Sequence, residues 1–429
     1  SRPSPSPRNV SSAASATESS LVVSLVGGSH VVNHMYFMLL PPIFGALRAD
    51  LGVSGPQAGV ALGLVGVVVT TLQLPLGYVA DAYSRTAVLG LSLSLGALGA
   101  ALTATATSYP WLLVAAAVTG AGIAGHHPAH YPLLASATDP STRGRAYSVH
   151  GFTGVLGFAA PPAIVGGASA LGFDWRVAIG AIAVVGAIYG VVCLLTFRRA
   201  VSTAVTHPDP GKRPGDGLDV AAIPGRAARW VRTVAASPAF VLLGVLWFLT
   251  SVAAWGIKAY TAPLLTATYG VADGTANLVV AAMLTSGAFL IFLGGWLSDR
   301  YSAGAVLIGG YAALIGVAGV LAWGALPTVA TLAVVLGLSA TVDGSRPARA
   351  KLADALSAEG DVGKNFGLLT IGMSGGGAVA PPAFGVVLGW TSIETVFAII
   401  AAVGALAVAM TLVVLAVHGR SPAPSQSGE

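Results

Sequence analysis

The sequence has a single cysteine, Cys193, and few charged residues. One cysteine excludes an intrachain disulfide and any cysteine-based metal cluster. Only 9% of the 429 residues are charged and 55% are hydrophobic, whereas a soluble domain carries roughly 25% charged residues. The chain also lacks the Gly-x-x-x-x-Gly-Lys-Ser/Thr phosphate-binding loop, which argues against direct use of ATP. Together these absences exclude an ordinary soluble protein and favour an integral membrane protein that ATP does not drive.

Long apolar runs then predict the architecture, because a transmembrane helix needs about 20 mostly apolar residues. Reading these runs between proline, glycine and charge breaks gives twelve spans and an all-α integral membrane protein. The spans are about 21–47, 56–79, 86–107, 109–134, 145–170, 174–197, 238–265, 273–297, 303–324, 327–352, 363–389 and 391–417.

One pattern of motifs occurs twice, at an offset of 218 to 220 residues. The first copy comprises 77–85, 127–130, 143–145 and 161–163, and the second comprises 295–302, 346–349, 362–364 and 381–383. Four matches in one order indicate two homologous six-helix halves, related by a pseudo-twofold axis. That plan is typical of a transporter with its site between the halves.

The repeat and the polar breaks define the expected domains. We expect a disordered tail at 1–20, an N-terminal half at 21–197, a cytoplasmic linker at 198–237, a C-terminal half at 238–417 and a tail at 418–429. No cleavable signal peptide is recognised. Only Arg48 and Arg176 fall in the predicted outer loops, so the positive-inside rule places both termini in the cytoplasm. The net charge of +5 therefore reflects orientation in the cytoplasmic membrane, and we expect a monomer that binds no nucleic acid.

The first pair of repeated segments identifies a family. Gly77, Asp81 and Arg85 match the motif Gly-x-x-x-Asp-Arg-x-Gly-Arg-Arg, and the second copy keeps part of it through Gly295, Asp299 and Arg300. This motif resembles that of the major facilitator superfamily, and the resemblance covers the chain from span 1 to span 12. Ala82, Ser84 and Thr86 depart from it.

Within that superfamily, residues 28–34, 39–43 and 51–54 resemble the fosmidomycin-resistance and related efflux group. Residues 157–167 are similar to the span-5 motif of antiporters. Residues 375–382 give span 11 much the same character, so a symmetric packing helix stays an open interpretation.

The motif residues are expected to act in gating. Gly77 lets two helices approach closely. Asp81 is expected to face the N-terminus of span 11, whose free N–H groups favour an anion. With Arg85 it forms a cytoplasmic latch; Asp299 and Arg300 are the second copy and have a more structural role. The alternative is that these charges only mark a cytoplasmic loop.

Polar residues inside the membrane carry the functional hypothesis, because ionisable groups there are costly and usually face a partner or a watery cavity. The resemblance implies that spans 1, 4, 7 and 10 line the central cavity, and the polar residues fall on these spans. The predicted substrate-binding residues are His30, Asn33, His34, His127, His130, Lys258, Arg346 and Arg349. His30, Asn33 and His34 are expected to share one helix face. Asp343, His34 and His127 are the predicted proton carriers.

Each of these assignments has a simpler alternative. His126 is expected to be a hydrogen-bonded packing residue. Lys258 lies late in its span, so its ammonium group could instead extend to the outer interface. Arg346 and Arg349 lie near the cytoplasmic end of span 10 and could reach the inner interface. Asp343 would then be an unpaired charge in the membrane.

The predicted function is secondary transport of a small anionic or amphiphilic molecule, coupled to protons and directed outward by antiport. Arginine favours phosphate, phosphonate or carboxylate, and histidine titrates near physiological pH. An importer of a carboxylate or phosphorylated metabolite is the alternative. A remote alternative is an intramembrane metal-dependent enzyme, but residues 126–130 have no adjacent carboxylate or cysteine. We therefore expect no enzymatic activity, catalytic residue, metal or cofactor.

Overall fold

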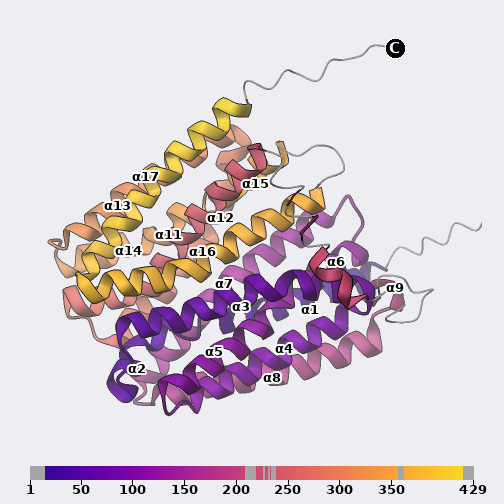
Figure 1. The fold of residues 1–429 in the computed structure, drawn as a ribbon, viewed down its shortest axis with the longest axis horizontal. Coiled ribbons are helices and arrows are strands. Elements are labelled where there is room, and N and C mark those ends of the chain that lie inside the picture. The colour runs from indigo at the N-terminus through magenta and orange to yellow at the C-terminus, as the bar shows by residue number, and fades with distance from the viewer. Residues whose placement is uncertain are drawn as a thin grey trace, which may run out of the picture.

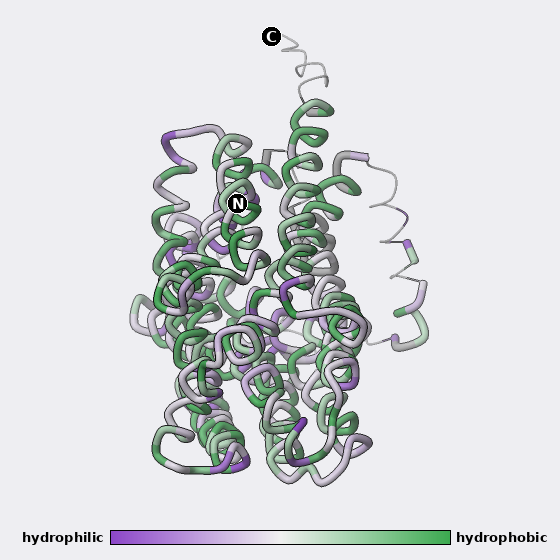
Figure 2. The backbone as a smooth tube through the Cα atoms, turned by 90° about the vertical axis from the view of Figure 1, so that its left-hand side faces the viewer, coloured by the Kyte–Doolittle hydropathy of each residue, from purple (hydrophilic) through white to green (hydrophobic). Residues whose placement is uncertain are grey.

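The computed structural model describes residues 15–207, 219–225, 228–229, 232, 238–355 and 362–418. Side chains of 220, 239–240, 355, 362–371 and 418 are not described. Every regular element in these residues is helical, and apolar residues dominate the backbone trace in Figure 2. Ten helices among the described residues are long and apolar enough to cross a membrane. The remaining two predicted spans are the broken helix 109–137 and the helix 362–390.

The N-terminal half contains the first six spans. Its elements are α1 (Ala16–Phe37), η1 (Pro41–Ile43), α2 (Phe44–Leu51), α3 (Gly55–Ala82), α4 (Arg85–Ala104), α5 (Tyr109–Ala124), α6 (His126–Ala137), α7 (Arg143–Ala170) and α8 (Trp175–Ala200). The short helices α9 (Thr203–Thr206) and η2 (Val220–Ala222) follow.

The C-terminal half contains the other six spans and lies above the first half in Figure 1. Its elements are α11 (Pro238–Tyr269), α12 (Asp273–Arg300), α13 (Ala303–Trp323), α14 (Thr328–Asp343), α15 (Arg346–Ala355), α16 (Val362–Trp390) and α17 (Ile393–His418). Each predicted span thus corresponds to one helix or one interrupted helix, and the twelve-helix architecture of two halves is confirmed.

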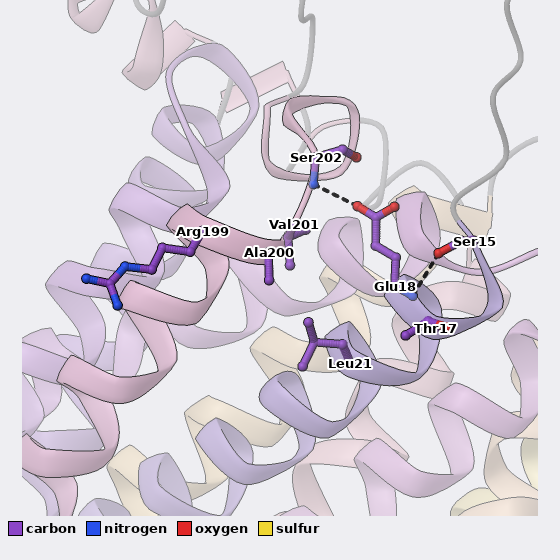
Figure 3. Close-up of a pocket in the computed structure, with 8 residues that line it drawn as sticks. All are labelled: Ser15, Thr17, Glu18, Leu21, Arg199, Ala200, Val201 and Ser202. Carbon is purple, nitrogen blue, oxygen red and sulfur yellow. Dashed lines mark hydrogen bonds between the residues drawn. The ribbon is translucent and has the colours of Figure 1, made fainter.

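The first helix begins earlier than predicted. Residues 16–20 are helical, so the expected disordered tail at 1–20 is wrong for them; residues 1–14 lie outside the described residues. The Ser15 hydroxyl caps the helix by accepting from the Glu18 amide at 3.1 Å. The Glu18 carboxylate in turn accepts from the Ser202 amide at 2.7 Å, as Figure 3 shows. The second bond joins the start of α1 to the segment after α8.

The predicted linker also begins later than expected, because α8 continues to Ala200. Its central part, 208–218, and residues 226–227, 230–231 and 233–237 lie outside the described residues. The C-terminal tail from 419 onward lies outside them as well.

The two halves pack closely at the end of the bundle that the sequence predicts to face outward. α3 runs along α16, and a Cβ placed at Gly66 would lie only 2.5 Å from the Ala378 nitrogen. The Asn277 amide donates to the Pro42 carbonyl at 2.8 Å, which joins α12 to η1. Glycine is therefore required in α3, because a larger residue would push the halves apart.

Spans 4 and 10 are both interrupted at the same place in the repeat. α5 ends before Gly125, and α14 ends before Gly344, which lies 219 residues later. A Cβ at Gly294 of α12 would collide with the Gly344 carbonyl, so this break packs tightly against α12. Broken helices in membranes are tolerated where they are buried in protein or line a cavity. His126 and Arg346 open the second segment of each span.

Candidate functional site

Six histidines from three helices form one cluster, which we name the imidazole cluster. Its members are His30 and His34 of α1, His126, His127 and His130 of α6, and His150 of α7. Five of them are buried and His127 is half-buried. The structure therefore brings all five histidines of spans 1 and 4 together and adds one from span 5.

His30 lies at the centre of the imidazole cluster. Its ring stacks on His150 with centroids 3.8 Å apart and on His126 with centroids 5.0 Å apart. His126 also contacts His130, with centroids 3.3 Å apart. Ring contacts, stacked and edge-on, thus help to hold several rings in fixed orientations.

Hydrogen bonds to the backbone fix where the protons of two histidines lie. His30 Nδ1 is 2.6 Å from the His150 carbonyl oxygen, and His34 Nδ1 is 2.7 Å from the Gly154 carbonyl oxygen. A carbonyl can only accept, so both Nδ1 atoms must donate. In neutral imidazoles both Nε2 atoms then carry lone pairs, although they are only 3.0 Å apart. The two lone pairs repel each other unless a cation lies between them, either a proton or a metal ion.

His130 presents a third bare nitrogen by the same reasoning. The Ser29 hydroxyl donates to the Val26 carbonyl at 3.0 Å, so it accepts from His130 Nε2 at 2.8 Å. His130 Nδ1 is therefore unprotonated in the neutral ring, and it has no hydrogen-bond partner among the described residues. Further buried nitrogens without a partner in this part of the chain are His127 Nδ1 and both ring nitrogens of His126 and His150.

Two glycines of α7 make these contacts possible. A Cβ at Gly154 would overlap the His30 ring, and one at Gly157 would lie 2.7 Å from His34 Cβ. Without side chains at these positions, α7 comes close enough to α1 for its carbonyls to accept from both imidazoles. The sequence of α7 thus positions the histidines of α1.

The C-terminal half holds a second group, which we name the cationic cluster: Lys258 of α11, Asp343 of α14, and Arg346 and Arg349 of α15. Arg346 Nη2 forms an ion pair with Asp343 Oδ1 at 2.9 Å, as the i,i+3 spacing predicts. Ser339 donates to the other carboxylate oxygen at 2.5 Å. Arg349 is 5% exposed, and its guanidinium lies over the Trp247 ring at 5.2 Å.

Lys258 connects the two clusters through aromatic side chains. Its Nζ lies 4.9 Å from the centre of the Phe158 ring in the opposite half, and that ring is 4.4 Å from the His34 ring. Lys258 is 6% exposed, so the alternative that it extends to the outer interface is wrong. The two clusters therefore lie next to each other across the boundary of the halves.

Two sequence predictions are wrong. Asn33 does not share the face of His30 and His34; its amide points to Ser92 of α4 at 3.4 Å. Asn33 lies three residues after His30 and one residue before His34, so a turn of 100° per residue rotates it about 60° from His30 and about 100° from His34. His126 was expected to be hydrogen-bonded, yet within the described chain neither of its ring nitrogens has a partner.

His150 was missed because span 5 was expected to be a packing helix outside the cavity. The available signal was composition, since the chain has only eight histidines and six fall within spans of the first half. Their abundance in apolar segments would have justified including His150.

The gating residues are placed as follows. Arg85 donates to Ser136 at 2.6 Å and to the Val205 carbonyl at 2.9 Å, which joins α4 to α6 and α9. A Cβ at Gly77 would lie 3.7 Å from Pro128, an ordinary contact, so close helix approach does not require glycine there in this state. The expected partner of Asp81, the N-terminus of span 11, follows residues 356–361, which lie outside the described residues. The latch stays a prediction.

In the described chain, the second copy of the motif contacts its own helix and α15. The Arg300 guanidinium lies over its neighbour Trp296 at 4.2 Å, and Lys351 donates to the Ser298 carbonyl at 2.7 Å. Asp299 is exposed and Gly295 has open space beside it. These contacts agree with a structural rather than a gating role for this copy.

Comparison with known proteins gives one family and one group of structures. The model of the Major Facilitator Superfamily matches residues 26–257 and 246–429. No curated protein matches the sequence. Among solved structures, a bacterial homologue of the human lysosomal transporter Spinster is similar in an inward-facing, occupied conformation, with a TM-score of 0.69 and 16% identity. The same homologue in its unoccupied conformation gives a TM-score of 0.68 and 17% identity. Both comparisons cover 94% of this chain and 97% of the other.

Proposed function

The chain belongs to the Major Facilitator Superfamily, and we propose that it is a proton-coupled secondary transporter of a small organic anion. Transport by a multi-pass membrane protein follows from the family. The anionic substrate, the proton and the direction are our proposal, which rests on the two clusters described above.

The observation that carries the proposal is the charge balance of the cationic cluster. Lys258, Arg346 and Arg349 supply three positive charges, and Asp343 is the only buried carboxylate among the described residues. Burying an unpaired charge is costly. A phosphate, phosphonate or carboxylate group would compensate the excess, and the planar guanidinium of Arg346 suits bidentate binding to such groups.

The ion pair between Arg346 and Asp343 provides a mechanism for proton coupling. Substrate that binds Arg346 competes with Asp343 and removes part of the positive field that keeps this carboxylate ionised. Asp343 then accepts a proton more readily. His34 and His127 are the other proposed carriers, because imidazole exchanges protons near neutral pH. Substrate and proton occupancy are thereby linked through one side-chain pair, and because the anion promotes protonation of Asp343, this pair by itself favours co-movement of the two.

Direction is proposed from the resemblance of residues 28–34, 39–43 and 51–54 to the fosmidomycin-resistance group, which favours efflux by proton antiport. An importer of a carboxylate or phosphorylated metabolite is the second candidate, since the same cationic cluster would bind its substrate. Rocking of 21–197 against 238–417 would expose the site alternately to both sides in either case.

The proposal is tested with the protein reconstituted in liposomes that contain a pH-sensitive dye. Organic phosphates, phosphonates, carboxylates and cations are added one at a time, with inward and outward proton gradients. Of these compounds, we expect only the anions to cause proton movement. Export by antiport requires that substrate and protons move in opposite directions. Co-movement would favour the importer, and a response to cations only would refute the anion hypothesis.

Asp343→Asn tests the coupling. We expect this variant to exchange substrate across the membrane while proton movement falls at least about tenfold, because an amide cannot take up the proton. Asp139→Asn is the matched control, since Asp139 is an exposed carboxylate in the loop after α6. Normal proton movement in Asp343→Asn would remove Asp343 from the mechanism.

A further inference from the structure

We propose that His30, His127 and His150 bind a divalent transition metal ion of the zinc class. Ring nitrogens of these three residues all lie within 4.8 Å of one another. They come from α1, α6 and α7, so three separate helices converge on one point. The proposal concerns the N-terminal half and does not depend on the nature of the transported substrate. While the metal is bound, the ligand nitrogens of His127 and His34 cannot take up a proton, so Asp343 is then the proton carrier.

The three ring nitrogens lie almost close enough together to bind one metal ion. A tetrahedral metal with bonds of about 2.0–2.1 Å separates its ligand nitrogens by roughly 3.3 Å. The ring nitrogens therefore need to approach one another by at most about 1.5 Å to complete the metal site. His127 is the half-buried member and lies in the first turn of α6, so its side chain has the most freedom to make this movement.

Orientation of the rings supports metal binding more strongly than proximity does. Metal-binding histidines usually donate their second N–H to a backbone carbonyl or carboxylate, which fixes the tautomer and points the bare nitrogen at the ion. His30 has this arrangement, with Nδ1 against the His150 carbonyl oxygen at 2.6 Å. His34 has it too, with Nδ1 against the Gly154 carbonyl oxygen.

A fourth ligand is available from His34. Its bare Nε2 lies 3.0 Å from that of His30, close to the distance between neighbouring ligands of one ion with bonds of about 2.0–2.1 Å. A shared cation removes the repulsion between these two lone pairs. Such a cation would also give a partner to buried ring nitrogens of His127 and His150, which have none among the described residues.

The donor set selects the metal. Imidazole is a ligand for zinc, copper, cobalt and nickel, whereas magnesium and calcium require oxygen ligands. The imidazole cluster offers only nitrogen. The sequence predicts no metal, because His126, His127 and His130 have no carboxylate or cysteine beside them. That interpretation considered ligands along one span, whereas the fold supplies His30 and His150 from two others.

The experiment measures metal binding by the full chain, purified in detergent with any histidine affinity tag removed and metals stripped with a chelator. Cobalt(II) is added as a spectroscopic probe. We expect one cobalt per chain, visible absorption bands typical of tetrahedral nitrogen coordination, and displacement of the cobalt by zinc. A protein that holds only a proton between His30 and His34 would bind no cobalt, and this result would overturn the proposal.

His150→Asn and His127→Asn should each weaken cobalt binding at least tenfold and change the absorption bands. His207→Asn is the matched control, because His207 lies after α9, outside the imidazole cluster. If His150→Asn fails to fold, His127→Asn decides the question, since its side chain is half-buried. Unchanged binding in His127→Asn would overturn the site.

Two further measurements separate this inference from the proposed function. Arg346→Ala should bind cobalt like the parent protein even where anion transport is lost. Uptake of radioactive zinc into liposomes shows whether the ion is itself transported or stays bound. Metal binding with no zinc uptake identifies a resident ion, and failure of anion transport leaves either result intact.

Discussion

The two halves of this transporter place different chemistry at equivalent positions of the repeat. His127 and His130 of α6 correspond to Arg346 and Arg349 of α15, at an offset of 219 residues. A guanidinium keeps its charge at any physiological pH, whereas the charge of an imidazole depends on its surroundings. One half therefore carries a permanent electrostatic site and the other a site whose charge can change.

The difference also extends to how each cluster is held. The cationic cluster depends on an i,i+3 ion pair along one broken helix, with Ser339 bound to the same carboxylate. The imidazole cluster depends on the approach of three helices and on carbonyls of α7. A single substitution should therefore mainly alter the charge of the cationic cluster in the C-terminal half. In the N-terminal half it should mainly alter the helix packing that positions the imidazole cluster.

The largest expected effect is in the permanent site. Arg346→Ala removes one of three cations and the bidentate donor, so anion binding should weaken about 10- to 100-fold, as for loss of a charged hydrogen bond. Arg346→Lys should recover only part of it, because lysine lacks the planar fork. Binding is measured by calorimetry on the purified protein, with the exposed Arg48→Ala as the control. Unchanged affinity in Arg346→Ala would remove this residue from the site.

A second variant at this position tests the comparison itself. Arg346→His makes the two halves alike, and the new imidazole is charged only below roughly pH 6.5 if its pKa is unperturbed. Anion affinity should then rise as pH falls and decline above that value, whereas the parent should lack this added dependence. Parallel pH profiles for the two proteins would show that the permanent charge of Arg346 is not what binds the anion.

The geometry of the imidazole cluster is tested at Gly154. Gly154→Ala places a methyl group on the His30 ring, and overpacking of this kind costs about 1–3 kcal/mol. Gly151→Ala is a matched control three residues away on the same helix, with nothing within 4 Å of the added Cβ. We expect a lower thermal unfolding temperature for Gly154→Ala only, with anion affinity kept. Equal stability of both variants would mean that α1 and α7 are not held at close contact.

The sequence predicted the twelve spans well, because membrane insertion depends on apolar length, which is a local property. His30, His34, His127 and His130 were predicted together as site residues, and they lie in one cluster, because i,i+4 spacing in α1 and i,i+3 spacing in α6 keep each pair near one helix face. Their role in binding stays a prediction. The interruption of spans 4 and 10 was not predicted, because the spans were defined by apolar length alone and the fall in hydropathy after Gly125 and Gly344 was not read as a break. His150 could not be placed beside His30 without knowing that two glycines let α7 approach α1.

Asn33 and His126 show the opposite case, in which the sequence analysis expected a contact that the structure does not contain. Both lie on helices that contribute to the site, but only packing decides which neighbour each side chain meets. Asn33 turns to Ser92 of α4, and His126 stacks between rings without a hydrogen bond to its nitrogens in the described chain. Helix assignment thus predicts candidates, and contacts between helices select among them.

The smallest expected effect is at the predicted latch, whose motif is more complete in the N-terminal half than in the C-terminal half. Asp81 is expected to face the N-terminus of α16, so Asp81→Asn should remove a charge–dipole interaction of roughly 0.3–1 kcal/mol. This change alters the balance between conformations rather than the substrate site, so turnover should fall up to about fivefold while affinity stays near that of the parent. Asp299→Asn is the control, since Asp299 is its repeat partner and belongs to the incomplete motif. Rapid-mixing transport assays and calorimetry on both variants decide the matter, because a change in affinity without a change in turnover would place Asp81 outside the gate.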